Sequence, residues 1–120
     1  MAEIQLGIIE GRFADMIWAN EPVTSTELVN LAEKAFSWKR TTTHTVIKRL
    51  CEKGLFMNNR GMVTSLLSRE QFYARQSRQF VEDSFDGSLP AFIAAFTKSG
   101  RLTAEEAAAI RAMIDEAEDK

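Results

Sequence analysis

The chain contains few of the side chains that most catalytic and metal sites require. Among its 120 residues there is one cysteine, Cys51, and one histidine, His44. A lone cysteine cannot form an internal disulfide, and the pair falls short of the three or four ligands of a zinc site. No nucleophile with a base, paired carboxylates or phosphate-binding loop is recognisable. The sequence therefore predicts no metal, no other cofactor and no enzymatic activity.

Long apolar runs and low-complexity segments are also missing. No apolar stretch approaches the roughly 18 residues that cross a bilayer, and the first residues carry no basic region before an apolar one. We therefore expect a cytoplasmic protein without membrane insertion. Apolar residues make up 45% of the chain and include eight Phe and two Trp, a composition typical of a folded protein.

The small net charge of −2 conceals an uneven distribution. From Lys34 to Arg60 there are seven cations and one anion, a net charge of +6, whereas the segment from Ser68 to Lys120 carries −3. The first segment can bind phosphates, and the second should lie away from nucleic acid. We predict a DNA-binding domain at 1–67 and a helical dimerisation domain at 68–120.

Three helices are expected in the first part. Apolar residues repeat at helical intervals over 9–18 and again over 28–35, where the second helix follows Thr24 at capping-box spacing. A third, basic helix is expected from Arg40 to Lys53, because Gly54 suits the position that ends a helix.

Two short strands follow, at 55–57 and 62–64, around a turn at 58–61 that is rich in Asn and Gly. Three helices and then a small β-hairpin are typical of a winged helix-turn-helix. The fold class is therefore mainly α, with C-terminal dimerisation helices after the winged helix.

The third helix is predicted to have two unlike faces. With residues 100° apart, Thr43, Val46, Ile47 and Leu50 share an apolar arc that must face the core. The threonine hydroxyl can form a hydrogen bond with a base edge, and its methyl group can contact the methyl group of thymine. Arginine can bind guanine or a phosphate. The DNA-binding residues expected on the opposite arc, on its flanks and on the wing are Arg40, Thr41, Thr42, His44, Thr45, Lys48, Arg49 and Arg60.

Several of these side chains have a second interpretation. The threonines could simply form a weakly helical surface turn, and His44 could be solvated without contacting anything. Cys51 falls at the edge between core and solvent, which favours packing over redox chemistry. Trp18 and Trp38 adjoin apolar faces, so core packing is favoured over stacking on single-stranded nucleic acid.

Helices are expected from Ser68 to about Asp86, after Ser88 and after Thr103. Their large apolar side chains have too few partners within one chain, so a second subunit should cover them. A monomer with these helices folded back on the winged helix is the alternative. The predicted dimerisation residues are Phe72, Phe80, Phe85, Leu89, Phe92, Ile93, Phe96, Ile110 and Ile114.

A set of short motifs, taken in order and spacing, resembles the BlaI/MecI penicillinase repressors. The resemblance covers nearly the whole chain, including Gly87-Ser88 and the closing Leu102-Thr103 helix. Its main motifs are Glu10 with Ile17-Trp18, Trp38 followed by Thr42 and Thr45, Arg49-Leu50, and Lys53-Gly54.

The resemblance implies a repressor that binds a palindromic operator as a homodimer with interlocked C-terminal helices. It also implies a membrane sensor protease that answers β-lactam and leads to cleavage in those helices, hence a role in antibiotic resistance. The best-known members are cut at an Asn-Phe bond, where this chain has Ala95-Phe96, so the cleavage bond and the inducer stay open. The copper-responsive branch has C-terminal cysteines that are missing here.

A winged helix can also serve as a protein-interaction module without direct DNA binding, because fold alone does not decide function. The net charge of +6 between Lys34 and Arg60 favours DNA as the partner. The sequence thus predicts a sequence-specific transcriptional repressor, with the interaction module as the alternative.

Overall fold

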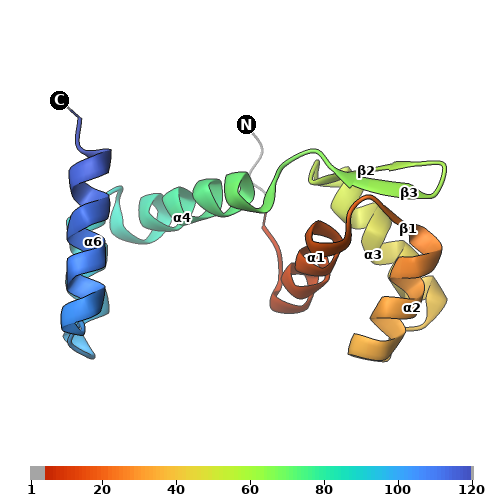
Figure 1. The fold of residues 1–120 in the computed structure, drawn as a ribbon, viewed down its shortest axis with the longest axis horizontal. Helices are drawn as coiled ribbons and strands as arrows, with labels where there is room; N and C mark the ends of the chain where they lie inside the picture. The colour runs from red at the N-terminus through yellow and green to blue at the C-terminus, as the bar shows by residue number, and fades with distance from the viewer. Residues whose placement is uncertain (1–4, 120) are drawn as a thin grey trace. The chain divides into compact units, whose positions relative to one another are not determined.

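The fold is shown in Figure 1 as a computed structural model that describes residues 5–119. The chain divides into two compact units between Ser77 and Arg78, inside α4, whereas the predicted boundary at 67/68 lies just before that helix. The mainly helical, winged helix-turn-helix class is confirmed. The elements are α1 (Ile8–Asn20), β1 (Val23–Thr24), α2 (Ser25–Phe36), α3 (Arg40–Glu52), β2 (Phe56–Asn59), β3 (Met62–Ser65), α4 (Arg69–Phe85), α5 (Leu89–Lys98) and α6 (Ala104–Ala117).

The first unit has one apolar core to which every element up to the start of α4 contributes. Trp18 and Trp38 pack against it, as predicted: the Trp18 ring lies 5.2 Å from that of Phe56, and the Trp38 ring 5.2 Å from that of Phe13. The largest fully buried side chains are Phe13, Phe56, Phe72, Ile17, Leu28, Leu50, Leu55, Val23, Val63 and Thr43.

Phe72 is one point where the structure differs from the sequence prediction. We expected it among the dimerisation residues, but its side chain is buried in the first unit, with its ring 5.8 Å from that of Trp18. The first turns of α4 pack on the winged helix, so this ring is not offered to a second subunit. Periodicity alone could not distinguish the two ends of one long helix.

The wing is a three-stranded antiparallel sheet in the order β1-β3-β2 rather than the predicted hairpin alone. Its extra strand pairs Val23 with Val63 and Thr24 with Met62. A two-residue strand is too short to leave a periodic signal. Thr24 also caps α2, since its hydroxyl oxygen accepts a 3.0 Å hydrogen bond from the Glu27 N–H. One residue thus joins the wing to the start of α2.

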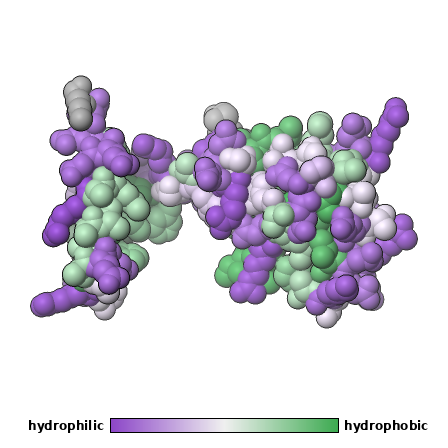
Figure 2. Space-filling view, in the orientation of Figure 1, coloured by the Kyte–Doolittle hydropathy of each residue, from purple (hydrophilic) through white to green (hydrophobic). Residues whose placement is uncertain are grey.

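The second unit consists of the end of α4, α5 and α6. The Ser88 hydroxyl accepts a hydrogen bond from the Ala91 N–H, and Thr103 forms a capping box with Glu106. Among residues 78–119 no side chain is buried, although apolar residues are many. Figure 2 shows such residues at the surface of this unit between hydrophilic ones. It therefore lacks a closed core of its own.

Candidate nucleic-acid interface

The turn between α2 and α3 fixes where α3 begins. Ser37 has a φ of 58° and its N–H donates to the Glu33 carbonyl oxygen at 3.0 Å, which closes the end of α2. Trp38 then packs its ring 5.0 Å from that of Phe36. Lys39 occupies the N-cap position of α3 without a side-chain capping bond. The start of α3 is therefore set by aromatic packing more than by capping.

One face of α3 is buried, as the helical spacing predicts. Thr43, Val46, Ile47 and Leu50 are all buried against the core of the first unit. The Thr43 hydroxyl donates to the Lys39 carbonyl oxygen at 3.2 Å, so its polar group has a partner inside the protein. The predicted core arc is confirmed, and the opposite face of the helix is turned to solvent.

The exposed face of α3 brings the predicted contact residues together. The Thr45 hydroxyl donates to the Thr41 carbonyl oxygen at 2.9 Å. Its remaining lone pairs can accept from the amino group of adenine or cytosine, and its methyl group can touch thymine. The exposed residues of this face and its flanks are Arg40, Thr41, Thr42, His44, Thr45, Lys48 and Arg49.

Arg60 lies in the turn of the wing. Its φ is 53° and that of Gly61 is 90°, so both residues are left-handed, as the favoured two-residue hairpin turn requires. The Asn58 side-chain oxygen accepts a 2.9 Å hydrogen bond from the Gly61 N–H. The exposed Arg60 side chain is carried at the tip of the hairpin, where a wing can reach a phosphate.

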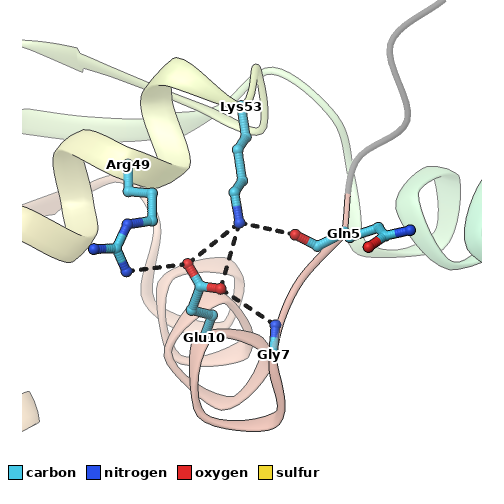
Figure 3. A network of polar contacts seen from close by, with 5 residues as sticks. All are labelled: Gln5, Gly7, Glu10, Arg49 and Lys53. Carbon is cyan, nitrogen blue, oxygen red and sulfur yellow. Dashed lines mark hydrogen bonds and ion pairs between the residues drawn. The ribbon is translucent and has the colours of Figure 1, made fainter.

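Glu10, in the first turn of α1, joins the start of that helix to the end of α3 (Figure 3). The Lys53 ammonium donates to both carboxylate oxygens, at 3.4 Å to Oε1 and 3.3 Å to Oε2. It also donates to the Gln5 carbonyl oxygen at 2.8 Å. The Gly7 N–H donates to Oε1 at 3.2 Å, and Arg49 Nη1 lies 3.7 Å from Oε2.

The pKa of the Glu10 carboxyl lies below its ordinary value. Burial by itself raises this pKa, but the hydrogen bond from Gly7 and the contacts with Lys53 and Arg49 outweigh burial. The carboxylate is therefore charged at neutral pH and compensates the charge of Lys53. Two cations of the basic segment, Lys53 and Arg49, thus share an anionic partner from outside it.

Sequence reasoning did not assign Glu10 to the site. It counted charges from Lys34 to Arg60, a window that leaves this carboxylate out. The only signal was its place in the resemblance to the penicillinase repressors. Its pairing with Lys53 depends on how α1 packs near the end of α3, which no local pattern predicts.

Cys51, the one cysteine, is half-buried at the edge of the core. Burial raises the pKa of its thiol, so it is not an activated thiolate.

Residues 5–119 contain no group of three His, Cys, Asp or Glu side chains that could hold a metal. No helix in the same range is long and apolar enough to cross a membrane.

Apart from Phe72, the residues predicted for dimerisation lie in the second unit. Phe92 is central among them, with its ring 5.9 Å from that of Phe80, 5.6 Å from Phe85 and 6.1 Å from Phe96. Ala95 and Phe96, the predicted cleavage pair, are both exposed within α5. Phe80, Leu89, Ile93, Phe96 and Ile114 are exposed, and Phe85, Phe92 and Ile110 are half-buried.

Three helices with a β-sheet wing, and a third helix exposing threonines and cations, define the first unit as a winged helix-turn-helix domain. The family follows from the sequence: the model of the penicillinase repressor family matches residues 6–116. The chain belongs to this family of transcriptional repressors, as the sequence motifs predicted. A comparison with individual curated proteins found no match.

Proposed function

We propose that this chain is a cytoplasmic transcriptional repressor that binds a palindromic DNA operator as a homodimer, with α3 in the major groove. The observation that carries the proposal is the division of α3 into two faces. Val46 and Leu50 are buried, which anchors the helix, while the polar and cationic side chains opposite them are exposed. The proposal includes no catalytic activity.

The position of each residue along α3 supports a division of roles. The N-terminal turn of a recognition helix enters the groove deepest. We therefore assign base contacts to Arg40, Thr41, Thr42 and Thr45, with His44 on the flank. Lys48 and Arg49 contact phosphates, and Arg60 contacts a phosphate from the wing.

The exposed apolar side chains of the second unit support a homodimer. A unit without buried residues has little to hold its short helices, because most helical stability comes from packing an apolar face. A second copy offers the same apolar surface, and two-fold symmetry brings like surfaces together. Two such subunits can hold two α3 helices at half-sites about 34 Å apart.

Binding to DNA from upstream of the chain's own gene tests the proposal, with fluorescence anisotropy as the measurement. Lys48→Gln and Arg49→Gln should each weaken binding and lower the salt dependence, by about 0.9 in the log–log slope per lost phosphate contact. Lys98→Gln, the same change in the second unit, is the control and should leave both unchanged. No binding at low salt would favour the protein-interaction module.

Derepression by proteolysis is the finer part of the proposal, and it rests on the family. A cut at Ala95–Phe96 divides α5 and separates α6 from the rest of the dimerisation surface. A membrane sensor protease system responding to β-lactam is the partner. Mass spectrometry of the repressor from induced cells should find a fragment ending at Ala95. An intact chain during induction contradicts this route.

A further inference from the structure

The two cations that contact Glu10 are held to different extents. An ammonium group has three N–H donors, and Lys53 has three acceptors in place: both Glu10 oxygens and the Gln5 carbonyl oxygen. Its side chain is 29% exposed, against 52% for Arg49. The hydrogen-bonding capacity of Lys53 is therefore already used within the protein.

Arg49 keeps most of its capacity. A guanidinium has five N–H donors, and the only contact to Glu10 is the long one of 3.7 Å from Nη1. The other terminal nitrogen of Arg49 points away from the carboxylate (Figure 3). Arg49 is restrained on the α1 side but can still bind a phosphate, whereas Lys53 would first have to break three contacts.

We propose that Glu10 is a positioning residue for DNA binding, which withholds Lys53 from the phosphates and leaves Arg49 as the phosphate contact at this end of α3. The inference rests on the proposed function. A phosphate contact strengthens binding to every DNA sequence alike. By withholding one such cation, Glu10 lowers the affinity for operator and for non-specific DNA alike, so that base contacts supply a larger share of the remaining binding free energy.

Salt titrations with a duplex of unrelated sequence test this role, with Lys48→Gln as the reference for a lost contact. That variant should lower the log–log salt slope by about 1.8, because each of the two subunits loses one contact worth about 0.9. Lys53→Gln should leave the slope at the wild-type value. Glu10→Gln should raise the slope by about 1.8 and tighten non-specific binding severalfold, because Lys53 is released in both subunits. The double variant Glu10→Gln/Lys53→Gln should return to the wild-type slope.

The melting temperature of each variant separates positioning from a merely structural role. A structural role lowers the melting temperature of Glu10→Gln without tightening its binding to non-specific DNA, which overturns the inference. The inference is also overturned if Lys53→Gln lowers the slope as Lys48→Gln does. If wild type binds no DNA at all, the proposed function fails and this inference fails with it.

Discussion

The indole N–H of Trp18, in α1, donates a 2.9 Å hydrogen bond to the carbonyl oxygen of Leu67, just before α4. Beside this bond the Phe72 ring packs on the same indole, and Ser68 and Gln71 cap the start of α4 reciprocally. The first turns of α4 are therefore part of the winged helix.

Replacing Trp18 by Phe should lower the free energy of unfolding of the first unit by about 1–3 kcal/mol. The change keeps an aromatic ring but leaves the Leu67 carbonyl oxygen without its donor in a partly buried place. Urea denaturation followed by circular dichroism measures the loss. A stability equal to that of the wild type would show that water replaces the indole without cost.

Alanine substitutions on the two faces of α3 should affect different properties, stability on the buried face and DNA binding on the exposed face. Leu50→Ala removes a fully buried side chain and should cost about 2–5 kcal/mol of stability. Lys48→Ala, two residues earlier and exposed, should change stability by less than about 0.5 kcal/mol while weakening DNA binding. Urea denaturation and anisotropy on the same samples check both. A stable protein with Leu50→Ala would contradict the buried arc.

Replacing glycine by alanine should lower the stability at one position, Gly61, and raise it at another, Gly11. Gly61 has a φ of 90°, so Gly61→Ala should destabilise the wing by about 1–2 kcal/mol. Gly11 lies inside α1, and apart from its chain neighbours and the backbone of its own helix no atom lies within 4 Å of an added Cβ, so Gly11→Ala should stabilise by about 0.5–1 kcal/mol. Thermal unfolding distinguishes them. Equal effects would contradict the positive φ.

The pH dependence of stability should report on Glu10. Its pKa is lowered from 4.5 by folding, so its contribution is complete above pH 4.5 and is lost as the pH falls through the folded value. The difference in unfolding free energy between wild type and Glu10→Gln should be constant near neutral pH and shrink below about pH 4.5. Urea denaturation across this range measures it. A difference that grows on acidification would reverse the assigned sign.

A charge on the apolar surface of the second unit should weaken the dimer. Ile93→Glu should raise the dimer dissociation constant more than tenfold, about 1.4 kcal/mol, because a buried carboxylate lacks a partner. Met57→Glu on the wing is the matched control, since the two side chains are 41% and 47% exposed. Sedimentation equilibrium gives the constants. Equal effects of the two variants would place the interface elsewhere.

The sequence by itself determined the local structure and the faces of the helices. Capping at Thr24, Ser88 and Thr103, together with the helical spacing of apolar residues, predicted where these helices begin. The same spacing separated Leu50 from Lys48. These signals suffice because capping bonds and helix faces involve residues three or four positions apart, which can be recognised in the sequence alone.

Only the tertiary structure decided the contacts between distant segments. It assigned Phe72 to the first unit, added Val23 to the sheet and paired Glu10 with Lys53. Each of these depends on how whole elements pack, and packing is set by shape and burial summed over many residues. A cation counted as free from the sequence can therefore be neutralised by a carboxylate from another helix.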